Sequence, residues 1–337
     1  MKKAALLILV LLAGTALALD YQTALSLAWQ RPTVISAQLK LDNLEAQLER
    51  TNADPLALRL DRLRAKQNRD LAAAELQLAR IRACSQISSA YTHVLDAEEQ
   101  VLLAQKALAL AEKVLKISRL RFDKGGASKQ DVIAAEIKLR EAQDQLKAAQ
   151  NGAQLARSQL VSLLGVEAGS DKLEPTPTLA TPAWREVSAA LQKHPDWLKP
   201  HQVAELAAVA YELLDPSYAA PAQIEEARVG MERAQKGAGE AERGLRLLIK
   251  QRWNEVSRQK RTAALAAEKL EKALSDLDIT RQRYRAGLIS ELALRHAELQ
   301  TDQVRLELSA AQHAQLAALW SLFEAAGWLP SEVCHAR

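Results

Sequence analysis

The chain has few of the residues on which disulfide-rich domains and globular enzymes depend. Its 337 residues include 2 cysteines, 12 glycines and 10 prolines, and aromatic residues make up only 4%. Two cysteines cannot form a disulfide framework. Cys84 is therefore interpreted as a structural thiol, and a single Cys84–Cys334 bridge is the alternative. Ala, Leu, Glu, Lys, Arg and Gln are abundant, which is typical of long helices and coiled coils.

Sequence motifs for catalysis and metal binding are also missing. The six histidines share no metal-ligand spacing, and the sequence contains no His-Glu-x-x-His, Cys-x-x-Cys or nucleophile-elbow motif. We therefore expect no catalytic residues, no metal site and no cofactor, and the chain is not predicted to be an enzyme.

A strong charge of one sign is absent as well. The formal net charge is +4, but two of the basic residues, Lys2 and Lys3, lie in a segment that we expect to be removed. Without them, 43 of the 45 basic residues remain against 41 acidic ones. This balance does not favour a nucleic-acid partner, and the mixed charges indicate solvated helix surfaces.

The N-terminus has the pattern of a secretory signal peptide. Lys2 and Lys3 precede the apolar run 4–12, and residues 16–18 (ALA) form a small-x-small cleavage signal. The run is shorter than the roughly 20 apolar residues of a spanning helix. We expect residues 1–18 to be cleaved and the mature chain to lie in the periplasm or cell envelope; an uncleaved anchor is the alternative.

An internal repeat organises the rest of the sequence. Segment 121–128 (RFDKGGAS) returns as 283–290 (RYRAGLIS), an offset of 162 residues read from the two positions. Other pairs keep this offset within one residue: Tyr91 with Trp253, Val94 with Val256, Gly165 with Gly327, Pro32 with Pro195, and Asp54-Pro55 with Asp215-Pro216. Repeats are the first feature to establish in a sequence because they decide the architecture. We predict these divisions: repeat 1 over 19–165, a linker over 166–183, repeat 2 over 184–327 and a tail over 328–337.

The sequence of each repeat predicts the same order of elements: a first helix, a short break, a very long helix, a tight turn and a return helix. Proline marks each break because it cannot continue the helical hydrogen-bond ladder, and glycine marks each turn. The long helices are expected over Leu58–Asp123 and Ile224–Arg285, each on the order of 90–100 Å at 1.5 Å per residue. The predicted fold class is all-α: two tandem repeats of a long antiparallel helical hairpin that form an α-barrel or coiled-coil bundle.

The first long helix carries two apolar stripes in which the spacing alternates between three and four residues. This alternation is typical of knobs-into-holes packing. The first stripe is Val94, Ala97, Val101, Ala104, Leu108, Ala111, Leu115, Ser118 and Phe122, and the second is Leu103, Ala107, Leu110, Val114 and Ile117. A helix with two stripes needs two neighbours, as in a closed barrel of helices; a solid bundle is the alternative. Polar residues such as Glu98, Lys106 and Arg119 are expected on the remaining, solvent-exposed side.

The residues around the predicted turns resemble the TolC-type outer-membrane efflux protein family. The similarity lies in the pattern Arg-Phe/Tyr-x-x-Gly-x-x-Ser, followed in the first repeat by Asp131-Val132, Ala135-Glu136 and Leu163-Leu164-Gly165, and in an opening Ala24-Leu25-Ser26-Leu27-Ala28. It covers both repeats. The resemblance implies a homotrimer whose hairpins form a periplasmic tunnel, and it implies that the hairpin tips contact a periplasmic adaptor (membrane fusion) protein of a tripartite pump. The implied contact residues are Gly125, Gly126, Ala127 and Ser128 in the first tip and Gly287, Leu288, Ile289 and Ser290 in the second.

One part of the family pattern is not found. Family members have a two-stranded β-hairpin between the first and the long helix of each repeat. A membrane-crossing strand needs about 9–11 residues with alternating polarity, and neither break in this sequence has room for two such strands. We therefore expect a variant that lacks the outer-membrane barrel strands.

Three carboxylates near the tips have two interpretations. In a trimer, Asp123, Asp131 and Glu291 could ring a tunnel entrance. Alternatively they serve helix capping and compensate the helix dipole, because Ser128 precedes Asp131 by three residues and Ser290 directly precedes Glu291. The function predicted from the sequence is a tunnel section of an efflux or export assembly associated with the outer membrane. A non-conducting periplasmic coiled-coil scaffold, envelope spacer or adaptor is the alternative.

Overall fold

The computed structural model describes residues 20–165 and 173–330, and within these ranges the chain is helical with connecting loops and no strand. This confirms the predicted all-α class. The predicted signal peptide, part of the linker, Cys334 and His335 lie outside the described residues. The elements are α1 (Tyr21–Ser26), η1 (Leu27–Gln30), α2 (Pro32–Ala53), α3 (Arg59–Asp123), α4 (Lys129–Leu164), α5 (Trp184–Ala190), η2 (Leu191–Lys193), α6 (Pro195–Glu212), α7 (Pro221–Arg285) and α8 (Glu291–Ala326).

The two repeats have matching helices. The long helices α3 and α7 each contain 65 residues, and the return helices α4 and α8 each contain 36. At 1.5 Å per residue, a 65-residue helix is about 100 Å long. Helix α7 begins at Pro221, three residues before the predicted start, because proline at the first helical position needs no hydrogen-bonded N–H and already has a helical φ.

The first helix of each repeat is divided where the sequence predicts one helix. Arg31 and His194 have ψ angles of 139° and 137°, and each precedes a proline that starts the next helix. The proline ring disfavours the α conformation of the residue before it. A short helix and a turn of 3₁₀ helix therefore come before each longer helix: α1 and η1 before α2, and α5 and η2 before α6. The chain bends where the 3₁₀ turn meets the proline.

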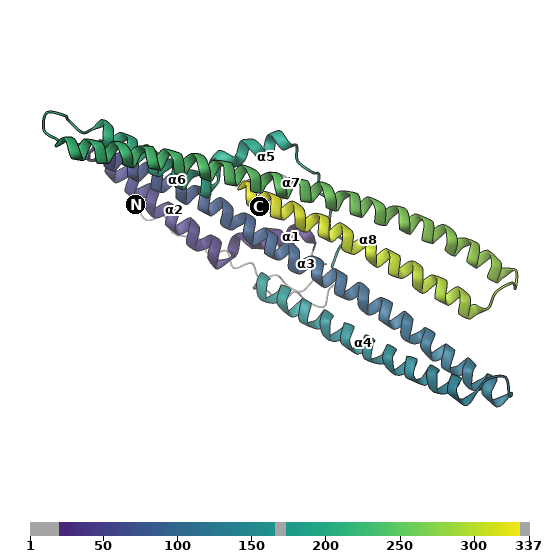
Figure 1. Ribbon diagram of the computed structural model, residues 1–337. Helices are drawn as coiled ribbons and strands as arrows, with labels where there is room; N and C mark the ends of the chain where they lie inside the picture. The colour runs from purple at the N-terminus through teal and green to yellow at the C-terminus, as the bar shows by residue number, and fades with distance from the viewer. Residues whose placement is uncertain (1–19, 166–172, 331–337) are drawn as a thin grey trace.

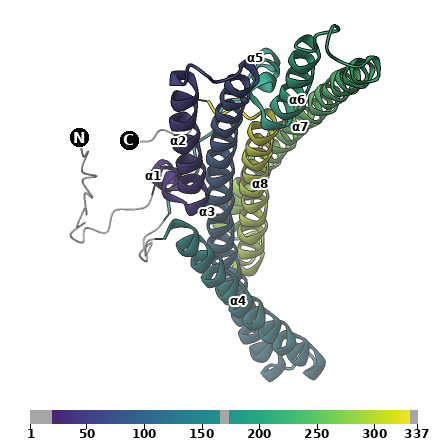
Figure 2. The ribbon, with the colours of Figure 1, turned by 90° about the vertical axis from the view of Figure 1, so that its left-hand side faces the viewer.

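The long helices extend through both halves of an elongated molecule (Figure 1). In one half, α3 packs against α4 and α8, and α7 packs against α8, so the order is α4, α3, α8, α7. In the other half, α3 packs against α2 and α6, and α7 packs against α6. Figure 2 shows α2, α3, α6 and α7 following one another across that end. Helix α3 thus has the two neighbours that its two apolar stripes predict.

The α8 side of α3 is marked by Leu110, which is 8% exposed and lies with α8 residues around one cavity. The α4 side is marked by Leu115, which is 6% exposed and lies near Leu139 of α4. The first and second stripes therefore face different helices. In this half, α8 is the one main neighbour of α7 among residues 20–165 and 173–330. Within that part of a single chain, the two-neighbour arrangement is complete for α3 and incomplete for α7.

An aromatic core lies in the middle of the molecule, where α1 packs against α3. The rings of Tyr21 and Tyr91 meet edge to face at a centroid distance of 5.4 Å. The Tyr21 hydroxyl donates to Ser88 Oγ at 2.7 Å and accepts from Trp320 Nε1 at 3.2 Å. Cys84 is buried in the same core. Tyr21, Tyr91 and Trp320 thus connect α1, α3 and α8 in this core.

Candidate functional site

The two hairpin tips share one backbone design. Gly125 and Gly287 have φ angles of 74° and 72°, a left-handed conformation that glycine adopts without steric cost. The next N–H, of Gly126 or Leu288, donates to the carbonyl five residues earlier at 2.7 and 2.9 Å respectively. This is the hydrogen bond of a Schellman motif, which ends a helix by satisfying one of its last carbonyls. The repeated glycine therefore fixes both turns in the same geometry.

The side chains at the two tips differ although the backbones agree. Leu288 is 74% exposed and Ile289 is half-buried. The equivalent positions in the first tip, Gly126 and Ala127, carry almost no apolar surface. The second tip therefore presents an apolar contact that the first lacks. Single exposed apolar side chains are common on protein surfaces, so contact of this tip with another protein stays a prediction.

Two of the three carboxylates proposed for a tunnel entrance have structural partners. Ser128 Oγ accepts from the Asp131 N–H at 3.1 Å, while the Asp131 carboxylate accepts from the Ser128 N–H and hydroxyl, both at 2.8 Å. This capping box, chiefly its backbone hydrogen bond, holds the pKa of Asp131 below its usual value. At the second tip, Ser290 Oγ accepts from the Ala293 N–H at 3.2 Å.

Glu291 interacts with another helix rather than with its own backbone. Its carboxylate forms an ion pair with Lys113 of α3 and lies 3.6 Å from Arg295. A hydrogen bond from Lys113 is the largest cause that lowers the Glu291 pKa. Asp123 is exposed at the end of α3. The structure therefore places Asp131 in a cap and Glu291 between the two hairpins, and a common ring of these carboxylates stays a prediction about the assembled protein.

Ion pairs flank both apolar contacts of α3, where the sequence predicts a solvent-exposed polar side. Toward α4, Arg157 pairs with Glu98 at 2.5 Å and Arg119 pairs with Glu136 at 2.8 Å. Toward α8, Lys106 pairs with Asp302 at 2.5 Å. Lys106 and Arg119 are exposed, as predicted, whereas Glu98 is half-buried. The charged groups of all three also reach across to the next helix, as long side chains at the edges of a seam can.

The described residues contain no group of three or more His, Cys, Asp or Glu side chains arranged to hold a metal ion. His194 is buried and has a structural role: its Nδ1 accepts from the Asp196 N–H at 3.1 Å, and its ring hydrogen-bonds the backbone of Glu324 at the end of α8. Arg31, its counterpart, donates to the Leu163 carbonyl at 2.7 Å at the end of α4.

In the part of the chain that the structure describes, no helix combines the length and apolar character needed to span a bilayer. No protein-family model matches the sequence, and no curated protein matches it either.

Solved structures, in contrast, match nearly the whole chain. The outer membrane protein VceC of Vibrio cholerae superposes with a TM-score of 0.66 at 16% identity, over 91% of this chain and 96% of that one. CusC, described in connection with transmembrane channel formation, gives 0.64 at 16% identity over 91% and 95%. The MtrE outer membrane channel of Neisseria gonorrhoeae, in its open state, gives 0.63 at 15% identity over 91% and 89%. The chain therefore has the fold of TolC-type outer-membrane channels.

Proposed function

We propose that this chain is a TolC-like component of an efflux or export assembly, in which three copies form a helical tunnel in the periplasm and carry out no chemistry of their own. The carrying observation is an open-edged layer of helices, α4–α3–α8–α7, in a chain that shares its fold with outer-membrane channels over 91% of its length. Among the described residues, neither outer helix of this layer has a second helical neighbour of the kind that α3 has.

Comparison of the two repeats shows which positions on the open edge of α7 correspond to more covered positions on α3. Leu103 and Ile117 belong to the stripe of α3 that faces α8, and both are half-buried. Their equivalents on α7, Leu265 and Ile279, are 53% and 46% exposed. Leu265 and Ile279 thus leave apolar surface on the α7 edge that is more covered at the equivalent positions of α3. The other three equivalents of this stripe are charged, Lys269, Lys272 and Asp276, so the proposed contact of α7 combines apolar and charged residues.

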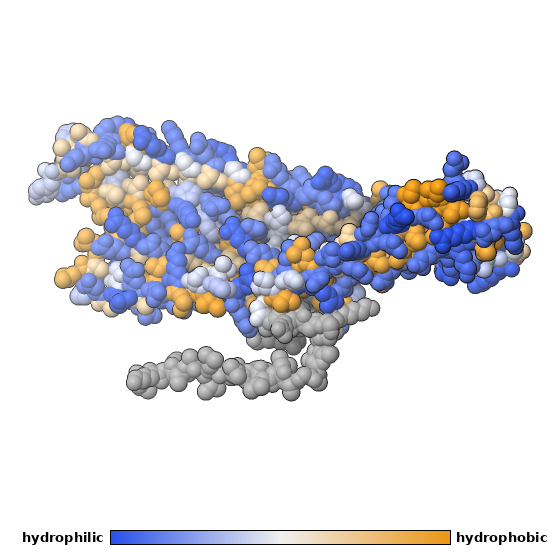
Figure 3. All heavy atoms as spheres, turned by 90° about the horizontal axis from the view of Figure 1, so that it is seen from below, coloured by the Kyte–Doolittle hydropathy of each residue, from blue (hydrophilic) through white to orange (hydrophobic). Residues whose placement is uncertain are grey.

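The edge of α4 offers the matching surface. Ile133, Ile137 and Leu155 fall on one side of this helix and are 45%, 50% and 60% exposed. Hydrophobic patches remain visible on the molecular surface of this half (Figure 3). If α4 of one copy packs beside α7 of the next, every helix of the layer has two neighbours. Such a head-to-tail contact closes into a ring when the rotation between copies allows it.

The mass of the purified mature protein tests this arrangement most directly. Light scattering or native mass spectrometry is expected to give three times the mass of one chain. The variant Leu265→Asp/Ile279→Asp places two charges in the proposed contact and is expected to give single chains. Leu102→Asp, also at an exposed position of a long helix (59%), is the matched control and should keep the trimer. A parent protein that stays monomeric at all concentrations would contradict the proposal.

Conduction separates a tunnel from a scaffold. In a planar bilayer that separates two aqueous compartments, a purified trimer that forms a tunnel should pass an ion current, whereas an envelope spacer or scaffold should not. Fractionation of cells should recover the protein with the envelope, in the periplasm or associated with the outer membrane.

The proposed adaptor contact is centred on the second tip. The variant Leu288→Asp/Ile289→Asp is expected to abolish pull-down of the periplasmic adaptor, because it replaces the exposed apolar pair with charges. Gly126→Asp/Ala127→Asp at the first tip is the control and should reduce the pull-down much less. Gly126 tolerates a side chain, since an added Cβ would lie 3.6 Å from its nearest neighbour. Equal losses from both tips would show that the Leu-Ile pair is not the determinant.

A further inference from the structure

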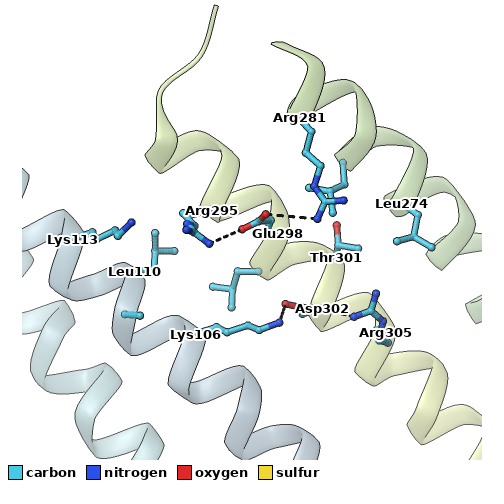
Figure 4. Close-up of a pocket in the computed structure, with 13 residues that line it drawn as sticks. Lys106, Leu110, Lys113, Leu274, Arg281, Arg295, Glu298, Thr301, Asp302 and Arg305 are labelled. Carbon is cyan, nitrogen blue, oxygen red and sulfur yellow. Dashed lines mark hydrogen bonds and ion pairs between the residues drawn. The ribbon is translucent and has the colours of Figure 1, made fainter. Parts of the chain in front are cut away.

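A cavity of about 520 Å³ lies between the two hairpins, at the junction of α3, α7 and α8 (Figure 4). Small-molecule sites in proteins typically occupy roughly 300–1,000 Å³. Its apolar lining includes Leu110 and Leu277, which are 8% and 6% exposed, and Leu274, which is 42% exposed. The cavity therefore has a covered hydrophobic floor and an accessible hydrophobic edge.

Basic side chains dominate the polar part of the lining. Lysines and arginines from all three helices contribute: Lys106, Lys113, Arg281, Arg295 and Arg305. Two carboxylates, Glu298 and Asp302, belong to the same lining. The five basic side chains are 45–59% exposed, whereas Glu298 and Asp302 are 28% and 17% exposed. The cations thus lie nearer the solvent than these two carboxylates, and Lys113 pairs with Glu291, outside the lining.

Two guanidinium groups converge on one carboxylate. Glu298 Oε2 lies 3.2 Å from Arg295, and its other oxygen lies 3.7 Å from Arg281. In Figure 4 both arginines point toward Glu298 from opposite sides. Glu291 also lies 3.6 Å from Arg295. A guanidinium carries five N–H donors, and two carboxylates cannot saturate the ten donors of both arginines. Donors therefore remain for a second anion at the mouth of the cavity.

The repeat shows that this basic cluster is particular to one hairpin junction. At the 162-residue offset, Lys106 corresponds to Glu268, Lys113 to Ser275, Arg295 to Ile133 and Arg305 to Gln143. Of these residues, only the pair Arg281–Glu298 has a counterpart with the same charges, Arg119–Glu136. The other cations are thus not required by the hairpin architecture itself.

We propose that this cavity binds an amphipathic organic anion, one that has an apolar body about the size of a sterol and a carboxylate or sulfonate group. The apolar body covers Leu110, Leu274 and Leu277, and the anionic group accepts hydrogen bonds from Arg281 and Arg295. Charge-assisted hydrogen bonds to guanidinium groups supply orientation, and burial of the apolar body supplies affinity. The site goes beyond the proposed tunnel function and holds whether or not the assembly conducts.

Isothermal titration of the purified mature protein with cholate below its critical micelle concentration tests the site. Saturable binding of one cholate per chain is expected. Cholate methyl ester, which keeps the apolar body but lacks the charge, should bind at least about tenfold more weakly, and acetate should not bind. Parent protein that takes up cholate only above the micelle concentration, or that binds the ester equally well, would overturn the proposal.

Variants locate the binding. Arg281→Gln/Arg295→Gln should weaken cholate binding at least about tenfold, and Arg119→Gln, which breaks the equivalent ion pair of the first hairpin, should leave it unchanged. Leu274→Glu should also weaken binding at least about tenfold. It introduces the residue that the first repeat carries at this position, Glu112, so the helix accepts it, and circular dichroism verifies that each variant is folded. Parental affinity in either cavity variant refutes the site. The site would also be refuted if the parent protein did not bind cholate but bound a glutamate-rich helical peptide, because the cavity would then be a contact surface for a protein partner.

Discussion

The glycines that end the two return helices allow backbone strain to be separated from packing. Gly165 and Gly327 have φ angles of 68° and 62°, so an alanine at either position must adopt the left-handed conformation. A Cβ on Gly165 would have no neighbour within 4 Å. A Cβ on Gly327 would lie 3.0 Å from His194 Cδ2 and 3.4 Å from His194 Cα. The same substitution thus meets open space in one repeat and a buried side chain in the other.

The expected magnitudes follow from these surroundings. The left-handed conformation costs about 1–2 kcal/mol for a residue with a Cβ, and this is the whole expected cost of Gly165→Ala. Gly327→Ala adds the cost of forcing an atom into a packed core, typically about 1–3 kcal/mol. His194 is only 4% exposed and its ring is hydrogen-bonded on two sides, so it cannot move away freely. Gly327→Ala should therefore destabilise the protein by about 2–5 kcal/mol in total.

Urea unfolding followed by circular dichroism at 222 nm measures both variants, at one protein concentration because assembly contributes to stability. A double-mutant cycle with His194→Ala isolates the contact. Removing the ring should bring the cost of Gly327→Ala close to that of Gly165→Ala. Equal destabilisation by the two single variants, or no effect of His194→Ala on the difference, would refute the assignment of the excess cost to His194.

Two further predictions concern buried polar groups. Burial lowers the His194 pKa in the folded protein, with Arg82 acting in the same direction and Asp196 and Glu324 opposing. The folded state then binds fewer protons than the unfolded state, whose His pKa is 6.5. This contribution to stability is complete above pH 6.5 and is lost as the pH falls toward the folded pKa. As the pH is lowered from 6.5, the urea concentration at the unfolding midpoint should therefore decrease in the parent and decrease less in His194→Asn. Identical pH profiles of the two proteins would contradict this. Tyr21→Phe removes the acceptor of Trp320 Nε1, and an unsatisfied buried donor costs about 1–3 kcal/mol. The urea midpoint should decrease accordingly, while near-ultraviolet circular dichroism should still show a packed core; an unchanged midpoint would show that the Tyr21 hydroxyl contributes nothing.

Local interactions made much of the fold predictable from sequence. Glycine at 125 and 287 determines two turns of equal geometry, because the left-handed conformation is a property of the residue and its immediate neighbours. The prolines at 32 and 195 also act locally, since each divides a first helix that the repeat pattern predicted to be continuous. The spacing of apolar residues on the first long helix was sufficient to predict two neighbours, since the helical period fixes which residues share a side.

Only the tertiary structure decided which helices those neighbours are and what lies between them. Lys106 belongs to the first repeat, Arg281 and Arg295 belong to the second, and each appears in the sequence as a solvated charge. They gather at one cavity because α3 and α8 belong to different repeats yet pack side by side. Each hairpin could thus be predicted from the sequence, because its helices and turn follow from short-range patterns. The contact between the two hairpins depends on long-range packing, which no single stretch of the chain encodes.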